Sequence, residues 1–179
     1  VTMVSEQSQP DPDFTHSPHP NPEDPRAYDQ LKILGSEIDA DLLISTDPDG
    51  DRFGICVKHK GEYVFLTGNQ TGAIFLEYIL SNKVKNNTLV TNPYVIFTFV
   101  TSTIAQLICD KYNVTLLETL TGFKWIGSVY NEQLKQGNAN FICGYEESFG
   151  FLLSNIGRDK DSLQASQLAI EAVSFYKNQ

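Results

Sequence analysis

The chain has 179 residues, of which 41% are hydrophobic and 20% charged, and its formal net charge is -9 at pH 7. This length is enough for a packed core and predicts one or two small domains. The acidic balance argues against a protein that wraps nucleic acid or coats an anionic membrane. No apolar run approaches the roughly 20 residues that a membrane-spanning helix needs. We therefore expect neither a nucleic-acid nor a membrane partner.

The first 30 residues differ in composition from the rest. They contain six acids and one base, and six of the eight prolines fall between Pro10 and Pro25. Proline removes a backbone donor, so this segment is expected to form neither a regular helix nor a central strand. Because the chain starts at Val1 without an initiator methionine, we expect it to be a piece of a longer protein.

From Asp29 onward, strand-like and helix-like segments alternate. The predicted helices are 31–38, 68–82, 102–112, 123–136 and 161–176, and the predicted strands are 41–46, 54–58, 62–66, 88–91, 95–100, 114–117 and 141–143. The apolar run 41–46 is typical of a buried parallel strand, and Lys60-Gly61 predicts a hairpin between the next two strands. This alternation predicts an α/β fold with mixed, largely parallel sheets flanked by helices. We place a division at residue 66, between units 1–66 and 67–179.

The three cysteines, Cys56, Cys109 and Cys143, are odd in number, far apart and flanked by apolar residues. This pattern favours buried free thiols over disulfides or a metal cluster. We therefore expect a reducing, cytoplasmic location.

A loop with three aspartates at alternate positions follows the predicted strand 41–46. Asp47, Asp49 and Asp51 offer hard oxygen ligands in the number that suits Mg²⁺. The loop would leave the carboxyl end of a parallel strand, where ligands bind in such sheets. A solvated acidic turn is the simpler alternative, but Arg52, which follows at once, disfavours it. The sequence therefore predicts a metal site here.

Two other motifs compete for the same loop. A calcium EF-hand needs Gly at its sixth position and Glu at its twelfth, where this chain has Arg52 and Lys58, so it is excluded. The aspartyl-phosphate loop of dehalogenase-like enzymes reads Asp-x-Asp-Gly-Thr, with the first Asp as nucleophile. Asp47-Pro-Asp-Gly matches it, but Asp51 stands where Thr belongs. This alternative stays open.

Two further loops carry polar groups suited to a ligand. Thr121 and Gly122 open the predicted helix 123–136, whose first N–H groups, with Lys124, could receive a polar or anionic ligand. A capped helix with a surface lysine explains this segment equally well. Downstream, the adjacent carboxylates Glu146 and Glu147 precede Ser148 in a glycine-bounded loop. Because a carboxylate accepts from two donors, this loop suits vicinal sugar hydroxyls.

Seven short motifs, taken in order, carry a resemblance to a known family. They are Pro10-Asp-Pro-Asp-Phe, Asn21-Pro-Glu, Thr46-Asp-Pro-Asp-Gly-Asp-Arg, Leu66-Thr-Gly-Asn, Thr121-Gly-Phe-Lys, Gly144-Tyr-Glu-Glu-Ser-Phe-Gly and Arg158-Asp-Lys-Asp. The chain resembles the α-D-phosphohexomutases, in particular their bacterial phosphoglucomutase and phosphomannomutase branch. The resemblance implies that 1–66 is a truncated second domain with the metal loop and 67–179 a third domain with the sugar loop. It also implies partners outside this sequence: a first domain with a phosphoserine and a fourth domain with a phosphate-binding loop.

The resemblance implies a reaction that interconverts hexose 1-phosphate and hexose 6-phosphate through the phosphoserine and a hexose 1,6-bisphosphate. Glucose is the expected substrate, with mannose or pentose phosphates as alternatives, and this chain alone is expected to be inactive. Mg²⁺ held by the three aspartates would contact the phosphoserine, and Arg52 the phosphoryl group or substrate. Glu146 and Ser148 would grip ring hydroxyls, beside Thr121, Gly122 and Lys124.

The resemblance also matches Lys160 to a lysine that the glucose-specific branch places near the reacting oxygen. A lysine that acts as a base near neutrality needs a depressed pKa. The alternative is a surface lysine paired with Asp159 or Asp161. One departure is Phe97, where relatives often have Lys, and this puts a cationic role at that position in doubt.

Overall fold

The structure, a computed structural model, describes residues 1–178. Its helices are the 3-10 turns Ser5–Gln7 and Pro25–Tyr28, α1 (Asp29–Glu37), α2 (Gly68–Lys85), α3 (Ile104–Tyr112), α4 (Phe123–Lys135) and α5 (Ser162–Lys177). Its strands are β1 (Leu42–Thr46), β2 (Phe53–His59), β3 (Glu62–Leu66), β4 (Tyr94–Thr98), β5 (Thr115–Thr119), β6 (Phe141–Glu146) and β7 (Gly150–Leu152). Within these residues no helix is long and apolar enough to cross a membrane.

The first sheet has the order β1-β2-β3 and is antiparallel throughout. The predicted hairpin is confirmed: Lys60 and Gly61 both have positive φ, as the tightest strand-matching turns require. The prediction that 41–46 is a parallel strand is wrong, because β1 pairs with β2 in the antiparallel sense. Its apolar run has another cause. Leu43 packs with Tyr28 on the α1 side, whereas Leu42 and Ile44 pack into the core on the other face.

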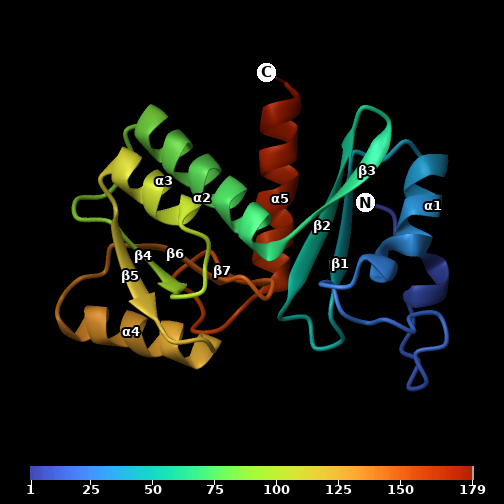
Figure 1. The fold of residues 1–179 in the computed structure, drawn as a ribbon, viewed down its shortest axis with the longest axis horizontal. Coiled ribbons are helices and arrows are strands. Elements are labelled where there is room, and N and C mark those ends of the chain that lie inside the picture. The colour runs from blue at the N-terminus through green and yellow to red at the C-terminus, as the bar shows by residue number, and fades with distance from the viewer. Residues whose placement is uncertain (179) are drawn as a thin grey trace.

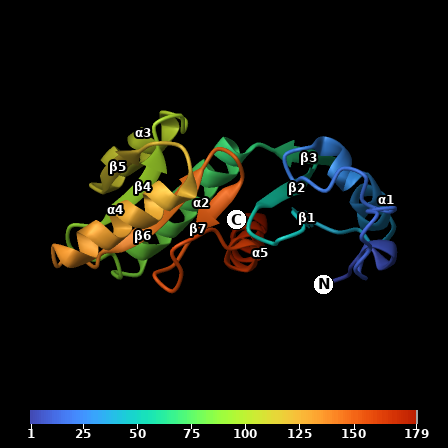
Figure 2. The same cartoon turned by 90° about the horizontal axis from the view of Figure 1, so that it is seen from below.

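The second sheet has the order β5-β4-β6-β7, in which β4 runs parallel to β5 and β6, and β7 is antiparallel to β6. Helix α4 covers one face, and α2 and α3 cover the other (Figures 1 and 2). On the α4 face Ile96 packs with Ile126, and on the opposite face Phe97 packs with Cys109. The expected α/β class with mixed sheets is confirmed, but the sheets are not largely parallel, because only the pairs β4–β5 and β4–β6 run parallel.

Helix α5 lies between the two sheets (Figure 1). The largest cluster of buried apolar side chains runs through this position, with Phe53 from β2, Phe151 from β7, and Ala165 from α5. The two sheets therefore share one core, and the loops at their lower edges in Figure 1 are brought together by it.

One predicted strand is absent from the structure, and one strand of the structure lies outside the predictions. Residues 88–91 form no strand, because Asn87 and Asn92 on either side of them have positive φ, which interrupts extended backbone. Conversely, β7 was not predicted, since a strand of three residues leaves almost no periodicity to detect. Helix α3 begins two residues after the predicted Ser102, with Thr103 at its N-cap position.

The cysteines match their prediction. Cys56, Cys109 and Cys143 are all free and buried. Burial raises the pKa of the Cys56 thiol to about 11 and that of Cys109 to about 12, so these thiols stay protonated near neutrality.

Candidate functional site

The loop between β1 and β2 brings the three predicted aspartates together. One carboxylate oxygen from each of Asp47, Asp49 and Asp51 lies within 4.8 Å of the others. The turn is closed by Gly50, which has a φ of +71° and donates its N–H to the Asp47 carbonyl at 3.1 Å. Asp47 is buried, Asp51 half-buried and Asp49 exposed. The loop is therefore open to a ligand on the Asp49 side.

Asp47 is held by hydrogen bonds on both of its oxygens. Its Oδ1 accepts from the backbone N–H groups of Asp51 and Arg52, at 3.1 and 3.0 Å, and its Oδ2 accepts from Arg52 Nε at 2.7 Å. Burial raises the pKa of Asp47, but the bonds from Arg52 outweigh it and lower the pKa on balance. The neighbouring Asp47 carboxyl raises the pKa of Asp49. A divalent cation would relieve this crowding of negative charge, so the donor set fits an oxygen-ligated metal.

Arg52 links the metal loop to the proline-rich segment. Its Nη1 donates to Glu23 Oε1 at 3.2 Å and to Asn21 Oδ1 at 3.4 Å, while its Nε serves Asp47. Its Nη2 forms no hydrogen bond within residues 1–178. The guanidinium therefore keeps donors free for an anionic group, as the substrate role predicted for Arg52 requires.

The turn between β6 and β7 carries the predicted sugar-binding motif. Its last residue, Phe149, is buried with a φ of +67°, and its carbonyl accepts from Phe53 N–H at 3.0 Å. Glu147 Oε2 accepts from Thr98 Oγ1 of β4 at 2.9 Å. We call residues 146–150 the sugar loop. It is hydrogen-bonded to the first sheet through Phe53 and to the second through Thr98.

Glu146 and Gly122 are in direct contact. Gly122 N–H donates to Glu146 Oε1 at 2.8 Å. Gly122 has a φ of +108°, a conformation that favours glycine, and it forms the N-cap of α4. Burial raises the pKa of Glu146, and the Gly122 N–H and the nearby Lys160 partly oppose this. Glu146 Oε2 forms no hydrogen bond within residues 1–178, so it can accept one from a ligand.

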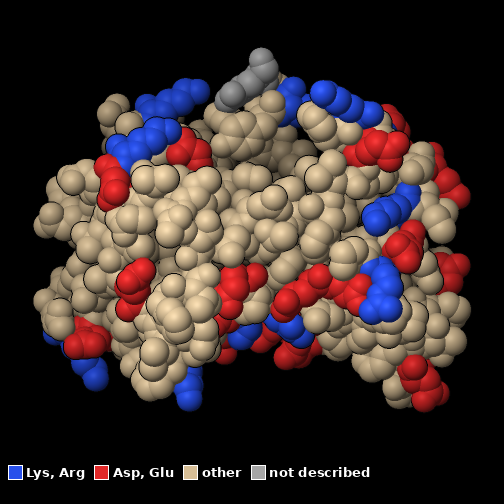
Figure 3. Space-filling model, viewed as in Figure 1, with Lys and Arg blue, Asp and Glu red and all other residues tan. Residues whose placement is uncertain are grey.

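Lys160 joins the metal loop to the sugar loop. Its Nζ lies 2.9 Å from Asp51 Oδ2 and 2.9 Å from Asp159 Oδ1, and 5.2 Å from the centre of the Phe123 ring. A methyl group on Gly150 would lie 2.9 Å from Lys160 Cγ, so the lysine stem rests on the sugar loop. Figure 3 shows acidic and basic side chains gathered in the lower middle of this face, below α5.

The charge state of Lys160 bears on its predicted role. Burial lowers the pKa of Lys160, but the ion pairs with Asp51 and Asp159 outweigh it, and the pKa is raised. A base would need the opposite shift. In this arrangement the ammonium is a charged donor. The alternative pairing with Asp159 is observed, whereas Asp161 caps α5.

The remaining predicted site residues make fewer contacts. Thr121 and Lys124 are exposed and Ser148 is half-buried. Lys124 Nζ lies 5.2 Å from the centre of the Trp125 ring, and Lys124 forms no ion pair within the described chain. Within residues 1–178, Gly122 is thus the only residue of segment 121–124 that forms a hydrogen bond with the sugar loop.

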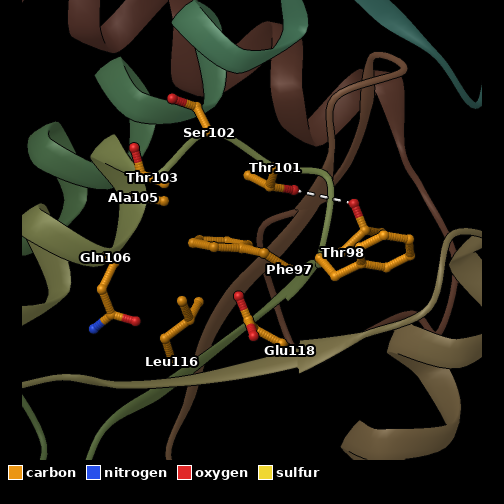
Figure 4. Close-up of a pocket in the computed structure, with 10 residues that line it drawn as sticks. Phe97, Thr98, Thr101, Ser102, Thr103, Ala105, Gln106, Leu116 and Glu118 are labelled. Atoms are coloured by element: carbon orange, nitrogen blue, oxygen red, sulfur yellow. Dashed lines mark hydrogen bonds between the residues drawn. The ribbon is translucent and has the colours of Figure 1, made fainter.

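A cavity of about 210 Å³ lies beside the site, at the ends of β4 and β5 (Figure 4). The Thr98 and Thr101 hydroxyls face each other there at 3.1 Å, and Glu118 lines it with its carboxylate. Phe97, 1% exposed, lies against the Tyr145 ring, with the ring centres 4.2 Å apart. None of the residues predicted for the site lines this cavity. Sequence reasoning missed Thr98. It included Glu147 as one of two adjacent carboxylates in the motif, but not its hydrogen bond from Thr98.

Comparison with known proteins matches both parts of the chain to domains of one family. Residues 1–61 match the model of the phosphoglucomutase/phosphomannomutase alpha/beta/alpha domain II, and residues 67–179 match that of domain III. A phosphomannomutase from Mycoplasmoides pirum is 37% identical over 171 residues, which are 96% of this chain and 30% of that protein. A phosphoglucomutase from Staphylococcus epidermidis is 39% identical over 178 residues, 99% of this chain and 32% of that protein.

Among solved structures, the chain is similar to the exocytosis-sensitive phosphoprotein pp63/parafusin, a phosphoglucomutase from Paramecium, in its open form. The TM-score is 0.68 at 25% identity, and the match covers 94% of this chain and 28% of that one. The chain thus spans about a third of the length of the curated relatives it matches. Its two consecutive domain matches and its relatives show that the chain belongs to the phosphoglucomutase/phosphomannomutase family of α-D-phosphohexomutases.

Proposed function

We propose that this chain is the central part of a phosphohexomutase that interconverts hexose 1-phosphate and hexose 6-phosphate, with glucose as the preferred sugar. One observation carries this proposal. Lys160 contacts Asp51 of the metal loop while its stem rests on the sugar loop, so the motifs of the two matched domains meet in one site. The division at residue 66 belongs to the same proposal, and the two domain matches on either side support it.

Mg²⁺ is the metal we propose for Asp47, Asp49 and Asp51, because three carboxylates within 4.8 Å offer hard oxygen ligands. When bound, Mg²⁺ would neutralise charge on a phosphoryl group in transfer. The chain's own residues would do the rest. Arg52 would bind the phosphoryl oxygens through its free Nη2, since Asp47 and Glu23 already fix its orientation.

The sugar loop would hold the hexose in two orientations. Glu146 has one oxygen fixed by Gly122 N–H and the other free for a ring hydroxyl. Ser148, half-buried in the same turn, would supply a second contact, and Thr121 and Lys124 would border the sugar from the α4 side. Lys160, kept charged by two carboxylates, would donate a hydrogen bond to the reacting oxygen.

The complete reaction also needs the phosphoserine, the terminal phosphate-binding loop and a hexose 1,6-bisphosphate intermediate, which the remaining domains of a parent protein would supply. We therefore propose that residues 1–179 alone do not turn over. Among the curated relatives, one phosphomannomutase is 37% identical and one phosphoglucomutase is 39% identical. Phosphomannomutase or phosphopentomutase activity in the parent is accordingly the alternative to glucose preference.

The metal site is tested by Mn²⁺ titration of the 179-residue chain, followed by electron paramagnetic resonance. We expect weak binding that Asp49→Asn lowers, because one anionic ligand is lost from an exposed position where the fold does not depend on it. Asp13→Asn, which removes an exposed carboxylate from the proline-rich segment, is the charge-matched control. Equal Mn²⁺ affinity of Asp49→Asn and Asp13→Asn would refute the site.

The substrate is tested in the full-length parent with glucose, mannose and ribose 1-phosphates in parallel. We expect the highest kcat/KM for glucose 1-phosphate and no turnover by residues 1–179 under the same conditions. Turnover by the 179-residue chain would contradict the need for the other domains.

A further inference from the structure

Lys160 is the counter-ion of one of the three candidate metal ligands. Its side chain is 16% exposed, and its Nζ lies 2.9 Å from Asp51 Oδ2 and 2.9 Å from Asp159 Oδ1. Asp51 is half-buried and its side chain 32% exposed. Water therefore screens the charges of this ion pair only in part, and the attraction between the ammonium and the Asp51 carboxylate is strong.

A divalent cation in the metal loop would bind the same Asp51 carboxylate. If it bound one oxygen of Asp51 while Nζ stayed on the other, the two cations would be only a few ångströms apart, and their repulsion would be large in this partly dry site. Asp47 does not relieve this repulsion, because the Arg52 guanidinium already pairs with its charge, at 2.7 Å from Nε to Oδ2. Lys160 and the metal are thus alternative partners of Asp51.

The surroundings of Lys160 offer it another anionic group. Its stem rests on Gly150, and a methyl group on Gly150 would lie 3.3 Å from Glu146 Oε2, the carboxylate oxygen that has no hydrogen bond within residues 1–178. Glu146 is therefore a second carboxylate beside the lysine stem, and rotation about the stem would turn Nζ from Asp51 toward it.

We propose that Lys160 is an internal cation that competes with the divalent metal for Asp51, and that metal binding transfers its ammonium toward Glu146 in the sugar loop. This inference rests on the proposed metal site. It adds a second role to the proposed contact of Lys160 with the reacting oxygen, because the ammonium would couple metal occupancy to the charge of the sugar loop.

The test is Mn²⁺ affinity of the 179-residue chain in three variants. Lys160→Met keeps the stem and removes the ammonium, Asp159→Asn removes the second carboxylate, and the double variant has the net charge of the natural chain. We expect roughly fivefold tighter Mn²⁺ binding in Lys160→Met, and binding tighter than in the natural chain in the double variant as well.

The outcomes separate the alternatives. Unchanged binding in Lys160→Met would overturn the proposal, because Lys160 would then not compete with the metal. Weaker binding would overturn it too, because Lys160 would then hold Asp51 in place for the metal. A double variant equal to the natural chain would overturn it too, because net charge alone would then explain the gain. If Asp49→Asn lowers Mn²⁺ affinity in either case, the metal site itself stands. If it does not, the site and this inference fail together.

A second measurement follows the ammonium itself. The ¹⁵Nζ resonance of Lys160, assigned by its loss in Lys160→Met, should shift when Mg²⁺ is added, whereas that of Lys124, which forms no ion pair in the described chain, should not. A Lys160 resonance that is unmoved at saturating Mg²⁺ would overturn the transfer toward Glu146. Circular dichroism of each variant confirms that the fold is intact.

Discussion

Gly68→Ala is expected to displace the sugar loop from the first turn of α2. Gly68 follows the Thr67 N-cap, and a methyl group on it would overlap the Glu147 carbonyl oxygen, lie 2.8 Å from the carbonyl carbon and 3.1 Å from Phe149 N. These neighbours are backbone atoms, which cannot rotate away as a side chain can. Non-bonded carbon atoms rest about 3.5 to 4.0 Å apart, so the loop and the helix must separate by roughly 1 Å.

The energetic cost can be bounded from this contact. Overpacking of a close contact lowers the free energy of unfolding by about 1 to 3 kcal/mol. The higher helix propensity of alanine offsets at most about 1 kcal/mol of this loss. We expect a net loss of about 1 to 2 kcal/mol in the free energy of unfolding. In the parent, a shift of this size at the sugar loop is expected to lower activity by up to about 100-fold.

The assay is urea unfolding of the 179-residue chain, combined with backbone amide shifts of residues 146–150. Gly157→Ala is the matched control, because a methyl group there has its nearest neighbours at 3.6 Å, an ordinary contact, and Gly157 is not among the glycines with positive φ. Full stability of Gly68→Ala with unmoved amide shifts in the sugar loop would refute the reasoning.

Three further predictions concern other contacts of the chain. Thr98→Val should cost about 1.5 to 3 kcal/mol in urea unfolding, because it leaves Glu147 without its 2.9 Å bond from a buried hydroxyl, whereas Thr115→Val, on an exposed position of β5, should cost little. Burial raises the pKa of Glu77, but hydrogen bonds from Lys111 and Tyr112 outweigh it and lower the pKa below its ordinary 4.5. The stability that this depression contributes, less than about 1 kcal/mol for a partly exposed pair, is therefore present above pH 4.5 and lost as the pH falls through the lowered pKa. Unfolding measured at about pH 6 and about pH 3 should show a smaller acid loss in Glu77→Gln, and an unchanged loss would contradict this. In the parent labelled with phosphosugar, the phosphate should survive hydroxylamine on a serine, whereas a hydroxylamine-labile label on Asp47 would favour the dehalogenase-like alternative.

The sequence by itself determined the features that depend on neighbouring residues. Helix α2 begins where Thr67 and Gln70 form a capping box, and the hairpin turns at Lys60-Gly61 because both positions take positive φ. The three aspartates lie within five residues of one another, so a single turn at Gly50 suffices to bring them together. Family membership followed from motifs of this kind, each short enough to read without the fold.

Strand direction was decided only by the tertiary structure. A continuous apolar run shows that both faces of β1 are covered, but it does not say which strand pairs with it, and the helices on its two faces, α1 and α5, come from opposite ends of the chain. The short strand β7 likewise exists because β6 lies beside it, not because of its own three residues.

The candidate site likewise combines residues that short motifs reveal with contacts that only the tertiary structure creates. Lys160 is predicted from its motif, but its contact with Asp51 joins residues that are far apart in the sequence, and the shared core around Phe53, Phe151 and Ala165 brings them together. That contact makes Lys160 a charged donor with a raised pKa, the opposite of what a catalytic base requires. Periodicity and motif spacing carry no information on such a pair, because the distance between its atoms is set by the packing of two sheets against α5.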